Sequence, residues 1–188
     1  MNAWTAAIRS WLAACLHAWD RFWFTPARPH TLALIRILAG GMLFYTHLVW
    51  AWDLDAFLGP HSWVTAGVSR ELSRDGYAWS HLWYVDSRML LWVLHGLALL
   101  VFAMLTLGLV TRVAAVLAWL TTVAYCHRLT GALFGLDQVN AMLAMYLAVG
   151  PSGDAYSLDR WLRRGRAGGR AADASIGVNI AIRLIQLH

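Results

Sequence analysis

The chain has 188 residues, of which 60% are hydrophobic and 13% are charged, and its formal net charge is +5. An ordinary soluble domain is about half apolar and about a quarter charged. Here the apolar residues also form runs long enough to cross a bilayer, so the sequence predicts a multi-pass membrane protein and argues against a soluble domain. Because cytoplasmic loops of membrane proteins are themselves basic, the positive charge gives no reason to expect nucleic acid as a partner.

Residues 4–24 predict a helix that lies in the membrane interface. The large apolar side chains recur there at helical spacing, and they are Trp4, Ile8, Trp11, Cys15, Trp19 and Phe22. Polar groups occupy other directions around the helix, as in helices that lie along a membrane surface. The alternative is a first membrane-spanning helix, which the charges of Arg9, Asp20 and Arg21 weaken. Prolines end the segment.

Residues 31–52 predict the first span, capped at its start by His30 or Thr31. The Gly40–Gly41 pair lies near mid-membrane, where small residues let a neighbouring helix approach closely. Arg36 lies about one turn inside the cytoplasmic end, so we expect its long side chain to extend to the interface. Tryptophans at the other end are typical of an aromatic belt.

Residues 53–87 form a long connection whose aromatic content favours short elements lying on the membrane surface. A second span over 88–110 and a third over 112–129 follow, joined too tightly for anything but an antiparallel hairpin. A short fourth span over 134–149 ends at Pro151.

The segment after Pro151 begins with a short amphipathic helix capped by Ser157. Asp159 lies in its first turn, where the helix dipole favours an anion. A loop rich in glycine and arginine follows, and residues 175–188 then begin a further apolar helix. That helix stops part-way through a developing span, so we expect the chain to be an N-terminal fragment of a longer protein.

The arginine distribution predicts the orientation. Most arginines fall in the N-terminal segment, beside the tight hairpin and between residues 160 and 170. The positive-inside rule therefore places the N-terminus and the 151–174 loop in the cytoplasm. The predicted architecture is a single all-α membrane domain over 1–188. It comprises an interfacial helix, a polytopic bundle of four spans and the start of a fifth.

Ionisable and polar residues inside a membrane are candidates for a functional site. With this topology several lie at similar depth near the outer ends of the spans. This candidate polar cluster consists of His47, His95, His127, Asp137, Gln138 and Asn140.

Three interpretations of this cluster stay open. It is a bis-histidine haem or metal site, a polar pocket for a substrate headgroup, or a set of interhelical hydrogen bonds that fixes the bundle. No His-x-x-x-His or Glu-x-x-His pair supports a metal, and nothing resembles a nucleophile elbow. The residues themselves therefore identify no catalytic residue, no metal ligand and no certain cofactor.

The order of several motifs resembles a known family. Phe24-Thr-Pro-Ala-Arg-Pro leads into Leu34-Ile-Arg-Ile-Leu-Ala-Gly-Gly, and the hairpin Gly108-Leu-Val-Thr-Arg112 follows. The chain continues through Tyr156-Ser-Leu-Asp159 to Ile182-Arg-Leu-Ile-Gln-Leu-His188. Over nearly its whole length the chain is similar to the horizontally transferred transmembrane (HTTM) domain family, the membrane portion shared with vitamin K-dependent gamma-carboxylases.

This resemblance implies a polytopic helical membrane domain with a reduced quinone as cofactor. In the carboxylases, oxygenation of the quinone generates the strong base that leads to carboxylation of glutamate side chains. The family's base is a lysine just after the segment matching 183–188, so Arg183, Gln186 and His188 would begin the helix that bears it. This chain contains no lysine, and it has Asp137-Gln138 near where the carboxylases carry an Asn-His pair.

Two functional interpretations follow. In the first, the chain is the N-terminal part of a carboxylase-like membrane domain that is inactive alone. In the second, it is a non-catalytic membrane module that binds a quinone, a lipid or a partner protein. Both make the lipid bilayer its first partner.

Overall fold

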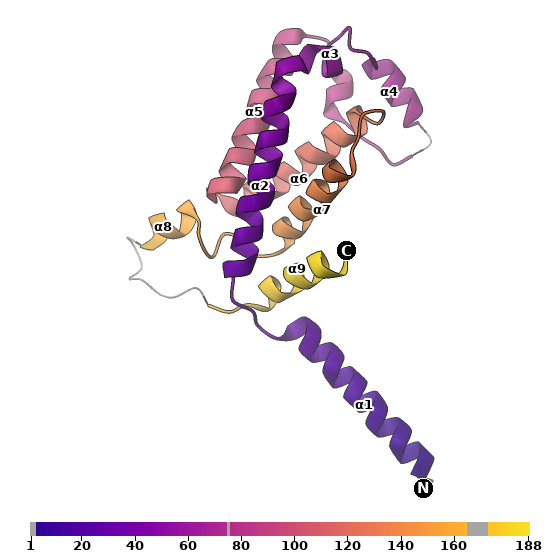
Figure 1. Ribbon diagram of the computed structural model, residues 1–188, viewed down its shortest axis with the longest axis vertical. Helices are drawn as coiled ribbons and strands as arrows, with labels where there is room; N and C mark the ends of the chain where they lie inside the picture. The colour runs from indigo at the N-terminus through magenta and orange to yellow at the C-terminus, as the bar shows by residue number, and fades with distance from the viewer. Residues whose placement is uncertain (1–2, 75, 165–172) are drawn as a thin grey trace.

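The computed structural model describes residues 3–74, 76–164 and 173–188, and this part of the chain is all-α (Figure 1). It contains no strand; an isolated antiparallel bridge joins Ala27 and Ser175. The predicted all-α class is therefore confirmed for the described residues. Arg166 and Arg170 belong to the loop that is predicted to be cytoplasmic, and they lie outside the described residues.

Each helix expected from the sequence is present, with ends within one helical turn of the expected residues. The long helices are α1 (Ala3–Phe24), α2 (His30–Trp50), α5 (Arg88–Leu107), α6 (Thr111–Arg128), α7 (Gly135–Val149) and α9 (Ile176–Leu187). The short elements are η1 (Ala51–Asp53), α3 (Leu54–Leu58), α4 (Ala66–Leu72), η2 (His81–Tyr84) and α8 (Leu158–Arg164). The predicted cap of the second helix is wrong, because α2 starts directly after Pro29 without a side-chain cap.

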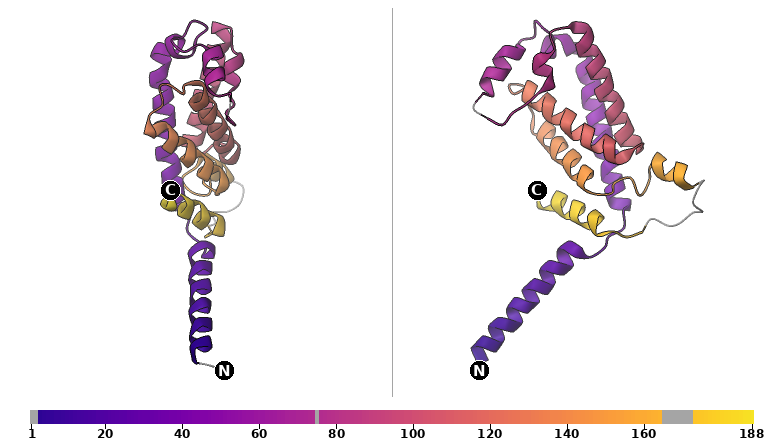
Figure 2. Two further views of the ribbon diagram at one scale, coloured as in Figure 1. Left: turned by 90° about the vertical axis from the view of Figure 1, so that its right-hand side faces the viewer. Right: turned by 180° about the vertical axis from the view of Figure 1, so that it is seen from behind.

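Helices α2, α5, α6 and α7 pack side by side into a bundle, while α1 projects away from it (Figures 1 and 2). The main core joins Leu43 of α2 to Phe102 of α5 and Tyr125 of α6. A second core joins α2 and α7 to Val178 of α9. Helix α6 contributes mostly small residues such as Ala118, which allow neighbouring helices to approach closely.

The bundle has two distinct ends. Helices α3 and α4 lie at one, which we call the α3–α4 end, and α8 and α9 lie at the other, the α8–α9 end (Figures 1 and 2). In the middle of α2, Gly40 lies so close to α5 that an added Cβ would be 2.8 Å from the Thr106 hydroxyl oxygen. The predicted close approach therefore occurs at Gly40, whereas Gly41 faces open space.

Arg36 closes the turn between α5 and α6. Its Nη1 donates to the carbonyls of Leu105 at 2.9 Å and Thr106 at 3.2 Å, and its Nη2 donates to the carbonyl of Tyr156 at 2.5 Å. The side chain is fully buried, with 0% of its surface exposed, so the expectation that it extends to the interface is wrong. The turn folds back over the guanidinium, and the left-handed Gly108 ends α5 beside it.

Asp159 holds the other side of the same turn. Its carboxylate accepts hydrogen bonds from the Val110 and Thr111 amides and from the Thr111 hydroxyl, each at 2.8 Å. Burial raises the pKa of this carboxyl, but the hydrogen bonds outweigh it, and the net pKa lies below the usual range. Asp159 lies in the first turn of α8 as predicted, but it caps α6.

The predicted cap of α8 is confirmed, because the Ser157 hydroxyl accepts the amide of Arg160 at 3.1 Å. At the opposite end of the bundle, Arg128 is buried and donates to the Val64 carbonyl at 2.8 Å and to the Ser62 hydroxyl at 3.0 Å. Each end of the bundle is thus tied to its connecting segment by one buried arginine.

Helix α9 packs under the bundle and holds the end of α1. The Asn179 amide donates to the carbonyls of Phe22 at 2.7 Å and Trp23 at 2.9 Å, which are otherwise unpaired at a helix C-terminus. The backbone bridge between Ala27 and Ser175 adds two more hydrogen bonds at the same place. The two bonds of Asn179 join residues that are 157 and 156 positions apart in the sequence.

Two stretches of the described chain are long and apolar enough to cross a membrane. They are His30–Leu58, which continues α2 through η1 and α3, and Arg88–Leu107, which is α5. Helix α6 has 18 residues but carries threonines and arginines, and α7 has 15 residues.

Candidate binding site at the α3–α4 end of the bundle

His95 lies at the centre of the buried polar network. Its Nε2 is 3.0 Å from the carbonyl oxygen of His47, and its Nδ1 is 2.8 Å from the hydroxyl of Tyr125. A carbonyl only accepts, so Nε2 carries the proton, and in the neutral ring Nδ1 accepts from Tyr125. The structure thus brings His95 to the backbone of α2 and to a tyrosine on α6.

His47 lies beside His95, but one of its ring nitrogens is left without a hydrogen-bond partner among the described residues. Its Nδ1 donates to the carbonyl of Leu43 at 2.8 Å, whereas its buried Nε2 has no hydrogen-bond partner among the described residues. Its ring is enclosed by Phe102 at 4.4 Å, Tyr125 at 4.8 Å and Trp50 at 4.9 Å between ring centroids. The two predicted histidines are therefore neighbours, with ring centroids 6.3 Å apart.

Trp50 separates this network from a cavity at the α3–α4 end. The Trp50 indole packs against His47 and Tyr125, and the same side chain lines a cavity of about 200 Å³. The remaining lining residues are Thr46, Phe57, Leu129, Ala132, Phe134, Leu136 and Asp137. They come from α2, α3, the α6–α7 connection and the start of α7, so the cavity exists only in the folded bundle.

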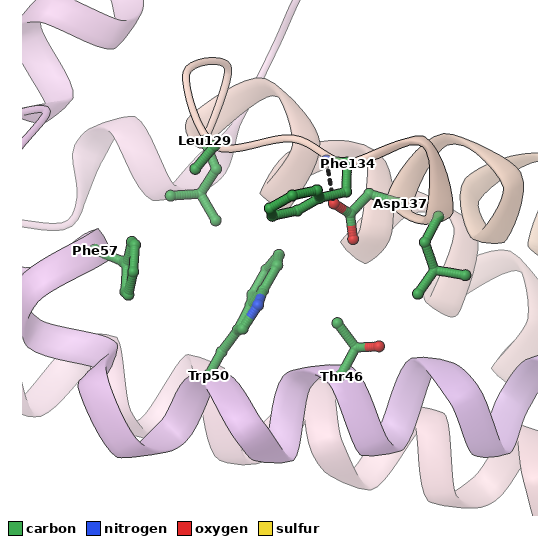
Figure 3. Close-up of a pocket in the computed structure, with 8 residues that line it drawn as sticks. Thr46, Trp50, Phe57, Leu129, Phe134 and Asp137 are labelled. Atoms are coloured by element: carbon green, nitrogen blue, oxygen red, sulfur yellow. Dashed lines mark hydrogen bonds between the residues drawn. The ribbon is translucent and has the colours of Figure 1, made fainter.

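Asp137 is the charged residue of the cavity lining. Its Oδ2 accepts the backbone amide of Phe134 at 2.9 Å and so caps the start of α7. Figure 3 shows the other carboxylate oxygen directed away from this bond, into the space between Trp50 and Thr46. The carboxylate therefore has one oxygen held by the helix start and one facing the cavity.

The other predicted members of the cluster take different positions. Asn140 is buried one turn below Asp137 on α7, and Gln138 is exposed. His127 lies beside Trp79, with its Nδ1 2.9 Å from the carbonyl oxygen and 3.2 Å from the amide nitrogen. The structure thus pairs His47 with His95, sets Asp137 in the adjoining cavity, and gives His127 a different neighbour.

The segment that the resemblance links to a catalytic base lies elsewhere, at the α8–α9 end. The guanidinium of Arg183 lies 4.4 Å from the ring centroid of Phe22 and donates to Gln186 at 2.8 Å. His188 lies 3.3 Å from the hydroxyl of Tyr146 and helps to line a second cavity of about 200 Å³ between α7 and α9. Arg183 thus contacts α1 and His188 contacts α7, whereas Gln186 is exposed and hydrogen-bonds within α9.

Sequence reasoning missed Tyr125 and the aromatic walls of the cavity. Trp50 was interpreted as part of an interfacial belt, and Phe57 and Phe134 belong to connecting segments without a clear periodicity. Tyr125 shares a face of α6 with Ala118 and Thr122 at helical spacing, and that pattern predicts burial. A buried tyrosine needs a hydrogen-bond partner, so this signal was available in the sequence.

Over residues 3–74, 76–164 and 173–188, no group of three or more His, Cys, Asp or Glu side chains is arranged to hold a metal ion. Comparison of the chain with protein-family models, with curated proteins and with solved structures finds no match.

Proposed function

We propose that this chain is a multi-pass helical membrane module with a binding role, inserted with its N-terminus in the cytoplasm. The observation that carries this proposal is an uninterrupted apolar face along α5. Met89, Val93, Leu97, Leu100 and Leu107 are all exposed along it. Soluble monomers rarely expose so large an apolar patch, whereas lipid tails would cover it at no cost.

Helix α2 supports the same placement. Leu34, Leu38, Tyr45 and Leu48 are exposed on the side that faces away from the bundle. We propose that α6 and α7 complete a set of four spans over 31–52, 88–110, 112–129 and 134–149. Their backbones are paired within the helices, as a bilayer requires.

The proposed binding role follows from how the polar groups are used. His95 and Tyr125 hydrogen-bond to each other, and Arg36 and Arg128 are bound to backbone carbonyls. The cavity beside Trp50 has room for a small group. Its volume of about 200 Å³ is below the range of roughly 300–1,000 Å³ that is common for drug-sized ligands. It suits a headgroup or small molecule better than a whole quinone.

We also propose, from the resemblance described above, that the fold of this chain shares its origin with the HTTM family. It would add a reduced quinone and a carboxylase-like chemistry that needs a basic lysine, and the present chain has none. The packing of Arg183 on Phe22 supports a structural use of the corresponding segment. We therefore propose a non-catalytic role for this chain by itself.

Single-cysteine labelling tests the proposed topology. Cys15 and Cys126 are replaced by alanine, and one cysteine is introduced at Gly67, Gly131 or Ala174, all exposed positions. A membrane-impermeant maleimide should label the first two in intact cells and the third only after permeabilisation. Equal labelling of all three positions, or release of the protein from membranes by alkaline carbonate, would overturn the proposal.

A further inference from the structure

The cavity beside Trp50 contains a carboxylate whose charge is incompletely neutralised. The side chain of Asp137 is largely buried, with 7% of its residue surface exposed, and none of the described arginines or histidines forms an ion pair with it. The α7 amides and dipole supply about half a positive charge at this point. A buried carboxylate without a full counter-charge is costly, so the cavity electrostatically favours a cation.

The walls of the cavity are suited to one kind of cation. Trp50, Phe57 and Phe134 supply three aromatic rings around it, and Figure 3 shows the Trp50 ring standing between Phe57 and Asp137. Aromatic faces attract cations within about 6 Å of the ring centroid, and Trp does so most strongly. A metal ion would need several oxygen ligands, whereas the lining is apolar apart from Asp137 and Thr46. The chemistry favours an alkylated ammonium.

The principal ring is held in place before any ligand binds. Trp50 packs against His47 and Tyr125, with ring centroids 4.9 Å and 5.9 Å away. Asp137 is fixed by the Phe134 amide. Preorganised groups of this kind lower the cost of ordering on binding. The volume of about 200 Å³ also matches a group of headgroup size rather than an extended ligand.

We propose that this cavity binds the organic ammonium group of a small amine or of a lipid headgroup. Asp137 supplies the counter-charge, and Trp50, Phe57 and Phe134 supply the aromatic walls. The inference deepens the proposed binding role, and its lipid arm rests on the proposed topology, which places the α3–α4 end at the outer leaflet. A choline or ethanolamine group would enter beside Phe134, a residue that is 77% exposed.

Choline is the probe for the first experiment. The full chain is purified in an uncharged maltoside detergent and an amine-free buffer, and binding of radiolabelled choline is measured by equilibrium dialysis. Its uncharged analogue 3,3-dimethyl-1-butanol has the same shape and serves as competitor. We expect unlabelled choline to displace the label and the neutral analogue to be at least about tenfold weaker, because the ion pair and cation–π contacts need the charge. Equal competition by both would overturn the proposal.

Two variants and one control assign the site. Asp137→Asn removes the charge but keeps an oxygen that can accept the Phe134 amide, and Trp50→Leu removes the central ring. Each should lower choline affinity by about tenfold or more. Asp53→Asn is the matched control, because it changes an exposed carboxylate at the same end of the bundle that does not line the cavity. Its choline affinity should stay within about twofold of the parent chain.

Nanodiscs distinguish the source of the ammonium group. In discs of phosphatidylglycerol alone, added choline should bind as in detergent. If discs that contain phosphatidylethanolamine suppress choline binding in the parent chain, the lipid headgroup occupies the site; if they do not, the ligand is a free amine.

Binding of neither choline nor phosphatidylethanolamine by a chain with the labelled topology overturns this inference alone. Failure of the labelling pattern itself overturns the proposed function. If Asp137→Asn does not fold, the choline affinity of Trp50→Leu and the competition by the neutral analogue decide whether the cavity is the binding site.

Discussion

At the scale of single residues, buried arginines at the two ends of the bundle bind backbone carbonyls rather than carboxylates. Arg36 donates to two carbonyls at the C-terminus of α5, where the helix dipole supplies about half a negative charge. Arg128 donates to the backbone carbonyl of Val64, which lies just before α4 at the other end of the bundle. These guanidiniums have fork-like donors that reach several carbonyls at once, which an ammonium cannot match.

Arg36→Lys tests this geometry. A lysine keeps the charge, but it cannot reach the carbonyls of Leu105, Thr106 and Tyr156 together. We expect a loss of about 3 kcal/mol of stability, measured as a lower melting temperature of the purified protein in detergent. Arg112→Lys is the matched control, because Arg112 is exposed near the same turn. Equal melting temperatures for the two variants would contradict the structural role of Arg36.

The lowered pKa of Asp159 predicts how the stability of the chain changes with pH. Its pKa is lower in the folded chain than in the unfolded chain, so its contribution to stability is complete above the ordinary aspartate pKa, about 4. The contribution is lost as the pH falls through the lower, folded value. We expect the melting temperature of the parent chain to drop more steeply than that of Asp159→Asn when the pH is lowered from 6 towards 3. Parallel curves would show that the carboxylate does not stabilise the turn.

The residue scale is also where sequence reasoning succeeded least. The position of Arg36 gave its distance from the helix end but could not show that residues 153–159 fold back over it. Equal depth placed His47 and His95 in one predicted cluster with four other residues, and in the structure their ring centroids are 6.3 Å apart. The separate place of His127 depends on η2 and the loop before it, whose path no periodicity reveals.

At the scale of elements, helix limits were predictable because local signals determine them. Gly108 and Gly150 marked the ends of α5 and α7, Pro29 marked the start of α2, and Ser157 marked α8. Helix pairing was less accessible, since it depends on which small residues meet a neighbour. Of the two adjacent glycines in α2, Gly40 lies against Thr106 and Gly41 faces open space. The sequence alone does not distinguish them.

The glycine pair therefore provides a matched test of how α2 packs on α5. In Gly40→Ala the new methyl group would meet the Thr106 backbone nitrogen at 3.0 Å, so one helix must shift. We expect a loss of about 1–3 kcal/mol, which is typical of overpacking. Gly41→Ala should be neutral or slightly stabilising, because alanine is the better helix former. Thermal unfolding of both variants in the same detergent checks the prediction, and the opposite ranking would contradict the α2–α5 interface.

At the scale of the whole molecule, the described bundle exposes many large apolar side chains in addition to its apolar core. Polar groups such as Arg36, His95 and Arg128 are buried, while leucines and valines cover the outside of α5. Helix α1 extends the same pattern, with Trp4, Trp11 and Leu16 exposed on a helix that projects from the bundle (Figure 2). An interfacial position for α1, predicted from the helical spacing of its apolar residues, stays a proposal.

A charge placed on the exposed face of α5 distinguishes a lipid environment from water. Leu97 is 52% exposed near the middle of the helix. In water, Leu97→Asp would change stability little, because exposed positions tolerate polar residues. In a bilayer the same change costs about 3 kcal/mol at the helix centre. We therefore expect Leu97→Asp to reduce the carbonate-resistant membrane fraction in cells, while Tyr77→Asp, at an exposed position in the connection before η2, leaves it unchanged. Normal membrane retention of Leu97→Asp would place this face of α5 in water and remove the main support for a membrane-spanning bundle.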